Sequence, residues 1–256
     1  METVYLEYEI LHDQPGLLGD VASLLGLLDI NINTVASIEG NYRGFLLEIQ
    51  DFEKKESLIK ALSSISDLKI SNFRPPELND FLALKHGKKI SWRKDGEIYH
   101  FYRTELELLL DLMSHFITGR SDVKLGLSGE PKVGKTETAI AAAVHANKEW
   151  RLLSTTLLRK IAVKKLSADL NSKTVFIIDA ITTFFRSSAE HVRFIRRFLS
   201  ETEAPIIIEH PQIFVQETEY DFDSFDMVIN LSSREDTGEN GDSSKYFQTF
   251  NSFDLS

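Results

Sequence analysis

Residues 129–137 read Gly129-Glu130-Pro131-Lys132-Val133-Gly134-Lys135-Thr136-Glu137. Residues 129–136 match the pattern G-x-x-x-x-G-K-[ST] at every fixed position. An apolar stretch at 123–127 precedes them and an alanine-rich stretch at 135–146 follows, so the sequence predicts strand, loop and helix in succession. Glycines let the backbone approach phosphate oxygens, and the N–H groups at the start of a helix attract anions. This stretch therefore predicts a loop that wraps the phosphates of a nucleoside triphosphate.

Each polar group of the loop has an expected role. Lys135 is expected to neutralise the β- and γ-phosphate oxygens, and the hydroxyl group of Thr136 to be a ligand of Mg²⁺. The sequence contains no N-K-x-D, the signature of guanine recognition, so ATP is the expected nucleotide. The side chain of Glu137, next in the helix, is expected at the rim of the same site.

A second motif ends in Asp179. The apolar run at 175–178 followed by this aspartate resembles a Walker B strand, whose acid holds the Mg²⁺ shell. ATPases that carry their general base directly after this aspartate have glutamate there, whereas this chain has Ala180. Another group is then needed to position the attacking water.

Two sets of residues could supply that group. Glu209 and His210 follow the apolar strand predicted at 205–208, at the edge where parallel sheets gather polar groups; the alternative is a polar pair that faces solvent. Helical spacing places Arg193 beside Arg196 and Arg197, which fits an arginine that stabilises transferred phosphoryl charge. A solvated basic helix face that docks the acidic tail is the alternative.

From residue 121 onward, strands and helices alternate. Apolar strands are predicted at 123–127, 151–155, 174–178, 205–208 and 227–231, with helices at 135–146, 157–170 and 188–200. Apolar strands separated by helices indicate a mainly parallel sheet buried on both faces, so residues 121–256 are predicted to form an α/β P-loop NTPase domain. A strand between those ending at Gly129 and Asp179 would favour an ATPase, and direct adjacency a kinase.

The first 74 residues show a different pattern. Strand spacing in residues 4–10, helical spacing in 17–28, two extended runs around the turn at 39–41, a helix after Asp51 and a last strand at 68–73 give the order βαββαβ. This is the ferredoxin-like arrangement.

Residues 13–21, D-Q-P-G-L-L-G-D-V, and the D-I-N-I that begins at Asp29 resemble the ACT domain family. That resemblance implies side-by-side pairing into a homodimer and a regulatory small-metabolite site that Asp13, Gly16 and Asn31 would line. Amino-acid-binding members often have asparagine where Asp13 stands, and a carboxylate there would repel a ligand carboxylate. A purely dimerising role is the alternative. The combination of an ACT-like domain with a P-loop domain resembles an uncharacterised bacterial family.

Residues 75–120 are predicted to connect the two parts through a hairpin at Asp95-Gly96 and a helix capped by Thr104. Bases and aromatic residues alternate around the hairpin, as in surfaces that bind single-stranded nucleic acid. A twisted hairpin with core aromatics and solubilising cations is the favoured alternative, and nucleic acid is not an expected partner. The residues concerned are Lys85, Lys88, Lys89, Trp92, Arg93, Lys94, Tyr99, Phe101, Tyr102 and Arg103.

Composition narrows the possible classes of protein. The chain has 256 residues, no cysteine and a net charge of −10, most of it in an acidic tail after residue 215. A disulfide framework or a thiolate site is excluded. Neither a signal peptide nor an apolar run long enough to span a membrane is recognisable, so a cytoplasmic location is expected.

Two functions fit these features. The first is a Mg²⁺-dependent ATPase or small-molecule kinase that the ACT-like module regulates. The second is a nucleotide-dependent sensor with little or no hydrolysis that acts through a protein partner, which Ala180 favours.

Overall fold

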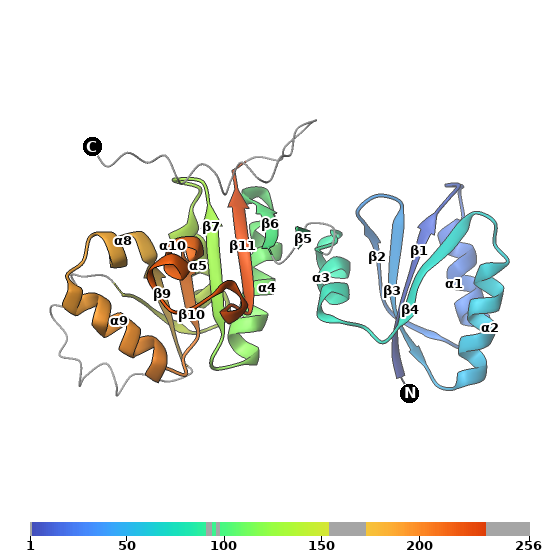
Figure 1. Cartoon of the computed structure of the whole chain (residues 1–256). Helices are drawn as coiled ribbons and strands as arrows, with labels where there is room; N and C mark the ends of the chain where they lie inside the picture. The colour runs from blue at the N-terminus through green and yellow to red at the C-terminus, as the bar shows by residue number, and fades with distance from the viewer. Residues whose placement is uncertain (1, 91–93, 96–97, 154–172, 234–256) are drawn as a thin grey trace.

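The computed structural model describes residues 2–90, 94–95, 98–153 and 173–233. Its strands form two separate sheets, one antiparallel and one almost entirely parallel (Figure 1). The predicted helix at 157–170, Trp92, Arg93 and the tail from residue 234 lie outside the described residues. Within the described ranges, no helix is long and apolar enough to cross a membrane.

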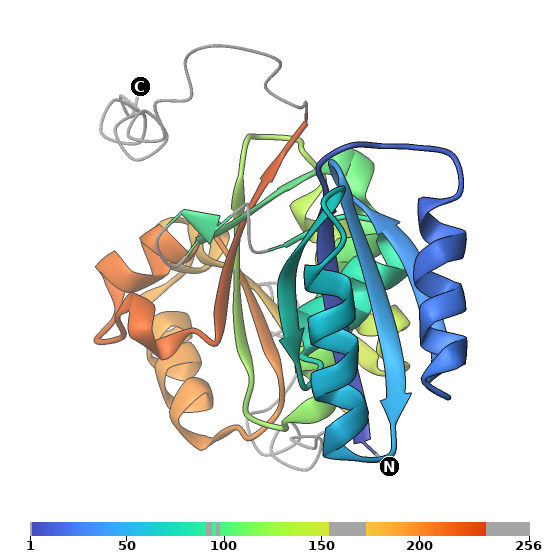
Figure 2. The same cartoon turned by 90° about the vertical axis from the view of Figure 1, so that its right-hand side faces the viewer.

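The N-terminal module has the predicted βαββαβ order. Its elements are β1 (Glu2–Ile10), α1 (Leu17–Leu27), β2 (Asn31–Ile38), β3 (Tyr42–Ile49), α2 (Phe52–Ser63) and β4 (Leu68–Arg74). The strands lie in the order β2-β3-β1-β4 and all neighbours are antiparallel. Figure 2 shows α1 and α2 side by side over one face of this sheet.

Local sequence explains where the two helices of the module begin. Gly16 precedes α1 with a φ of 98°, a conformation that glycine adopts without a steric cost. Asp51 caps α2 because its carboxylate accepts a hydrogen bond from the Lys54 amide at 2.9 Å. Apolar residues of both helices then pack on the sheet in one core.

A helix absent from the sequence prediction, α3 (Leu78–His86), covers the other face of the antiparallel sheet and lies between the two sheets (Figure 1). Ala83 and Leu84 of α3 pack there against Tyr5, Ile38 and Leu46. A Cβ atom on Gly44 would lie 2.9 Å from Leu84 Cδ2, so the glycine permits this close approach.

The second sheet has the strand order β5-β6-β11-β7-β10-β9-β8. All neighbours are parallel except the antiparallel pair β5 and β6. The strands are β5 (Lys94–Asp95), β6 (Ile98–Tyr102), β7 (Lys124–Gly129), β8 (Glu149–Leu152), β9 (Thr174–Asp179), β10 (Ile206–Glu209) and β11 (Met227–Ser232).

Helices cover both faces of this sheet. On one face, α4 (Leu106–Gly119) and α5 (Lys135–His145) share a core with Val175 and Ile177 of β9. On the other face, α9 (Ala189–Glu201) and α10 (Pro211–Glu217) share a second core with Phe176 and Ile178. Successive strand residues point to opposite faces, which explains why this strand is apolar at every position. A further short helix, α8 (Ala180–Phe185), follows β9 directly.

The predicted connecting segment at 75–120 contributes to the larger sheet. Its strand β6 pairs in parallel with β11, and α4 packs in the core on one face of that sheet. A 3₁₀ turn, Arg103–Glu105, separates β6 from α4. This turn lies at the same edge of the sheet as the loop at 129–136, because β6, β11 and β7 run in the same direction.

Candidate functional site

The loop of residues 129–136, called the GKT loop below, joins β7 to α5 as predicted. Its backbone has positive φ at Gly129 (140°), Lys132 (66°) and Gly134 (96°). A Cβ atom on Gly129 would lie 2.2 Å from the carbonyl oxygen of Leu231 in β11. Glycine is therefore required at this point both by the backbone angle and by the neighbouring strand.

Lys135 is the first residue of α5 and is only 7% exposed. Its ammonium group donates hydrogen bonds to the carbonyl oxygens of Gly129, at 3.0 Å, and Glu130, at 2.8 Å. Burial lowers the pKa of Lys135, and the carboxylates of Glu209 and Asp179 oppose that shift. The buried ammonium group of Lys135 is thus held near two carboxylates, those of Asp179 and Glu209, which come from two strands of the sheet. The side chains of Pro131, Lys132 and Glu137 are exposed around it.

Asp179 and Glu209 stand in register at the carboxyl ends of β9 and β10. Asp179 also caps α8, since its carboxylate accepts hydrogen bonds from the Thr182 hydroxyl at 2.6 Å and the Thr182 amide at 3.3 Å. Glu209 is paired with Leu127 of β7 on its other side. The parallel register therefore brings two acids, which are far apart in the sequence, to the edge that holds the GKT loop.

Glu209 is the most unusual group of the site. It is 4% exposed, and its Oε1 atom has no hydrogen-bond partner in the described part of the chain. Burial raises the pKa of Glu209; a hydrogen bond with Thr136 lowers it, Asp179 raises it and Lys135 lowers it. A buried carboxylate with a raised pKa at the edge of a sheet has the properties of a general base.

His210 follows Glu209 in a left-handed conformation, with a φ of 60°. Its Nδ1 atom is buried, and no described residue forms a hydrogen bond with it. Burial and the positive charge of Lys135 lower the pKa of His210, whereas Asp179 raises it. The imidazole therefore favours its neutral form beside the buried ammonium group.

The arginines predicted on α9 have other contacts or are exposed. Arg193 is exposed, Arg196 donates to the carbonyl oxygen of Glu217, and Arg197 pairs with Glu201 at 2.8 Å. In the described ranges, no hydrogen bond or ion pair joins Arg193 to Lys135, Asp179 or Glu209. All three arginines lie on α9 as predicted, and the partners of Arg196 and Arg197 are Glu217 and Glu201, which are not part of the GKT loop.

Arg103, one of the bases that alternate with aromatic residues around the hairpin, contacts the GKT loop. Arg103 Nη1 donates a hydrogen bond to the Val133 carbonyl oxygen at 3.0 Å. A Cβ atom on Gly134 would lie 2.8 Å from the same nitrogen. The signal available in the sequence was a base directly after an aromatic strand, but only the parallel pairing of β6 with β11 puts that strand end beside the loop.

Three other cations of the hairpin region form ion pairs. Lys85 pairs with Asp111, Lys88 with Glu105 and Lys89 with Glu7. Phe101 is buried in the core of the larger sheet, and Tyr99 packs against that core.

The predicted effector residues fall into two groups. Asp13 and Gly16 lie in the exposed loop after β1, whereas Asn31 begins β2 and is in register with Glu48 of β3. Glu48 in turn faces Thr3, near the start of β1. At about 3.3 Å per residue, Asn31 and Asp13 are separated by roughly the length of β1, about 20 Å or more within one copy. Asn31 forms hydrogen bonds with Asn33 at 2.8 Å and Glu48 at 3.4 Å.

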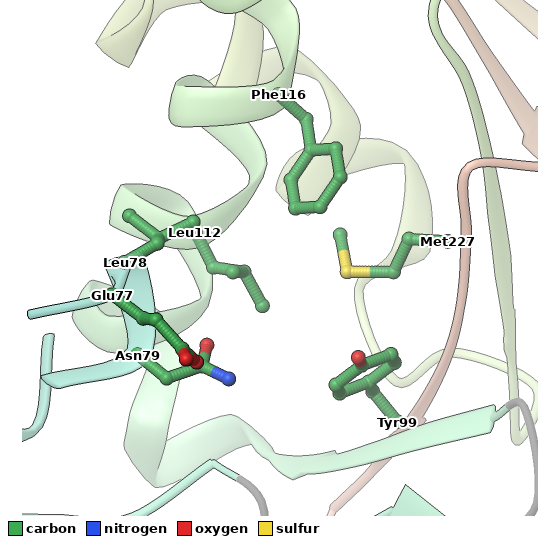
Figure 3. Close-up of a pocket in the computed structure, with 7 residues that line it drawn as sticks. All are labelled: Glu77, Leu78, Asn79, Tyr99, Leu112, Phe116 and Met227. Atoms are coloured by element: carbon green, nitrogen blue, oxygen red, sulfur yellow. The ribbon is translucent and has the colours of Figure 1, made fainter. Parts of the chain in front are cut away.

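A hollow of about 210 Å³ lies at the opposite edge of the larger sheet. Figure 3 shows Leu112 and Phe116 of α4 and Met227 at the start of β11 facing it, with Tyr99 below them. The remaining lining residues, Glu77, Leu78 and Asn79, come from the start of α3. Met227 begins β11, whereas the GKT loop follows the carboxyl end of the neighbouring parallel strand β7. The hollow is therefore separated from the GKT loop by the length of these strands.

A family model described as "Protein of unknown function (DUF3388)" matches residues 70–254. The chain belongs to this family. A protein of Bacillus subtilis (strain 168), described as "Uncharacterized protein YmfK", is 38% identical over 98% of this chain and 96% of its own length. The family is therefore a bacterial one; its model does not extend over residues 1–69, which the Bacillus protein matches almost completely.

Solved structures give weaker likenesses. Prephenate dehydratase from Staphylococcus aureus is 26% identical over 28% of this chain and 29% of its own, with a TM-score of 0.26. PCH-2 from C. elegans is 15% identical over 50% of this chain and 43% of its own, with a TM-score of 0.36. Both TM-scores are too low for either likeness to identify the fold or the activity of this chain.

Proposed function

We propose that the C-terminal part of the chain is a P-loop NTPase domain that binds ATP with Mg²⁺ and hydrolyses it. One observation carries this proposal: Lys135, Asp179 and Glu209, from three separate segments, meet beside the GKT loop at one edge of a parallel sheet. Open parallel sheets bind their ligands at that edge.

The residues present fit the chemistry of a magnesium-bound triphosphate. Lys135 would exchange its two carbonyl acceptors for phosphate oxygens, and the N–H groups of the loop and of the start of α5 would bind the rest of the phosphate chain. Thr136 and Asp179 are hard oxygen ligands, which Mg²⁺ prefers, with water and phosphate completing the shell. When bound, the ion neutralises charge on the phosphates.

The position of β10 favours an ATPase over a small-molecule kinase. This strand lies between β7, which leads into the GKT loop, and β9, which ends at Asp179. It also places Glu209 beside Thr136. Glu209 would take the proton of the attacking water, a role that Ala180 cannot fill and that a buried carboxylate with a raised pKa suits.

A nucleotide-dependent sensor is the second candidate. It is favoured by Ala180, which is fully buried at the start of α8, and by the hydrogen bond that engages Glu209 with Thr136. In that case, ATP would bias the conformation of the protein and a partner would read it, with little turnover.

The N-terminal module would act as an ACT-like regulatory domain. Asp13 and Gly16 lie at one end of β1 and Asn31 at the other, so a site that used all of them would need a second copy of the chain. The expected assembly is therefore a homodimer through this module. Sedimentation at micromolar concentration should give a dimer, and a monomer alone would remove this part of the proposal.

Calorimetry and phosphate release with MgATP test the nucleotide site. Wild-type protein should bind MgATP and release phosphate, and Lys135→Ala should weaken binding about 100-fold because charge-assisted hydrogen bonds to the phosphates are lost. Arg120→Ala is the matched control, since that cation pairs with Asp226 at the far edge of the same sheet.

The outcomes separate the two candidates. Binding with Lys135-dependent phosphate release supports the ATPase. Tight binding without release leaves the sensor. If the intact protein takes up no magnesium-bound triphosphate at all, both candidates are rejected.

A further inference from the structure

Two successive lysines after α3 pair with acids on different parts of the molecule. Lys89 donates to Glu7 Oε1 of β1 at 2.7 Å, with side chains only 11% and 3% exposed, respectively. Its ammonium group also lies 3.7 Å from the centre of the Tyr42 ring. Glu7 further accepts hydrogen bonds from Tyr5 at 2.8 Å and Asn72 at 3.1 Å, so Lys89 is anchored in the N-terminal module.

Lys88 points to the other part of the chain. It donates to Glu105 Oε1 at 2.9 Å, and the Glu105 side chain is 1% exposed. The second oxygen of Glu105 accepts the amide of Tyr102 at 3.0 Å. The 3₁₀ turn that begins at Arg103 is therefore held by a carboxylate whose charge Lys88 compensates.

Arg103 extends this chain to the GKT loop. Its hydrogen bond to the Val133 carbonyl oxygen lies one residue before Gly134, where φ is 96°. Val133 is itself buried, so the loop is fixed from the core by Val133 and from outside by Arg103. A Cβ atom on Gly134 would lie 2.8 Å from Arg103 Nη1, so the guanidinium group lies directly against this glycine.

We propose that Arg103 is a positioning residue for the GKT loop and that the Lys88-Lys89 pair couples its position to the N-terminal module. The chain of contacts runs from Glu7 to Lys89, from Lys88 to Glu105, and from the Arg103 turn to Val133. The regulatory role rests on the proposed nucleotide binding; the mechanical link does not.

The burial of the acids makes such a link effective. Separating Lys89 from Glu7 would leave a buried carboxylate without this cation, which is strongly unfavourable. Glu105 is equally buried, whereas the Lys88 side chain that pairs with it is 37% exposed. The two pairs therefore favour an arrangement in which β1, the Lys88-Lys89 segment and the Arg103 turn stay together. A ligand that shifts β1 would change the loop's affinity for MgATP, and MgATP would change the affinity for that ligand by the same factor.

Amide hydrogen exchange of Val133 and Thr138 in the full chain, without nucleotide, tests the link directly, because these amides donate to the carbonyl oxygens of Glu130 at 3.4 Å and Gly134 at 2.9 Å. Arg103→Ala should speed exchange of these amides about tenfold, as expected for losing one charge-assisted hydrogen bond, and Arg103→Lys should restore part of the protection. Arg120→Ala removes an arginine that pairs at the far edge of the sheet and should leave these amides unchanged.

A second set of variants tests the Lys89–Glu7 pair, at the end of the chain of contacts that lies in the N-terminal module. Lys89→Met leaves Glu7 buried without its cation, so the double variant Glu7→Gln/Lys89→Met, which removes both charges, guards against simple unfolding. Both should speed exchange at Val133 and Thr138 and weaken MgATP binding several-fold. Lys54→Ala, which breaks the exposed pair with Asp29 in the same module, is the control.

Unchanged exchange at Val133 and Thr138 in Arg103→Ala would overturn the positioning role. A change in that variant but none in folded Glu7→Gln/Lys89→Met would overturn the coupling. If wild-type protein binds no MgATP while the exchange results hold, the proposed function fails and the mechanical link survives.

Discussion

The seven-stranded sheet has an amino edge and a carboxyl edge, where its parallel strands begin and end. The polar groups at these two edges differ in how they are paired. At the amino edge, Asp226 accepts hydrogen bonds from Arg120 and, at 2.9 Å, from the Lys124 amide. Arg120 also pairs with Asp122. Each of these charges is exposed or paired with an opposite charge, as in an edge that serves stability alone.

At the carboxyl edge, charged groups are buried and incompletely paired. Lys135 donates hydrogen bonds to backbone carbonyl oxygens. Among the described residues, Glu209 Oε1 and His210 Nδ1 have no hydrogen-bond partner. The pKa of Glu209 is raised. Unpaired buried polar groups cost stability, so their concentration at one edge indicates a function. Backbone strain is found there too, at Lys132 and His210.

Replacing Glu209 by glutamine gives the largest expected effect. Loss of a general base should lower kcat for ATP hydrolysis by about 100- to 10,000-fold. The affinity for MgATP should stay close to that of wild type, because glutamine keeps the shape of the side chain. Phosphate release and calorimetry measure the two quantities, with Glu201→Gln on exposed α9 as control; unchanged kcat would remove Glu209 from the mechanism.

Glu209→Gln should raise the stability of the folded protein, whereas a substitution of Asp226 at the amino edge should lower it. Burial raises the pKa of Glu209 in the folded protein above its value in the unfolded chain. The contribution of Glu209 to the free energy of unfolding is therefore fully present below the pKa of the unfolded state, and it is lost as pH rises through the pKa of the folded state. At pH 7, the ionised form is a cost that Glu209→Gln removes, so Tm should rise by about 2–4 °C.

Asp226→Ala should instead lower the free energy of unfolding by about 1–3 kcal/mol, since it leaves the Lys124 amide without its acceptor. MgATP affinity should not change in this variant. Thermal melts of both variants at pH 7 provide the measurement. A fall in Tm for both would mean that the two edges do not differ in the way described.

The pH dependence of turnover should show the smallest effect. Glu209 can act as a base only when ionised, so kcat/KM, which reports the protein without nucleotide, should fall tenfold per pH unit below the raised pKa of Glu209. The acid limb should therefore lie above 4.5, the ordinary value for glutamate. The residual activity of Glu209→Gln should lack this limb; an acid limb at the ordinary value would contradict the assignment.

Much of the architecture could be read from periodicity. The alternation in residues 4–10 and the helical spacing in 17–28 depend only on which face of an element is buried, and both elements formed as predicted. The turn at 129–136 was predicted with its strand and helix because its pattern is local, with glycines where the backbone needs positive φ. By contrast, α3 was missed, since its nine residues gave too short a periodic signal.

What sequence determined by itself was local: the elements of the N-terminal module, the strands of the parallel sheet and the glycines of the loop. Tertiary structure alone decided which strand ends meet. The insertion of β10 between β7 and β9, which brings Glu209 to Thr136, and the pairing of β6 with β11, which brings Arg103 to Val133, depend on strand order. Strand order follows from packing helices on both faces of the sheet at once, and such long-range packing leaves no periodic trace in any one segment.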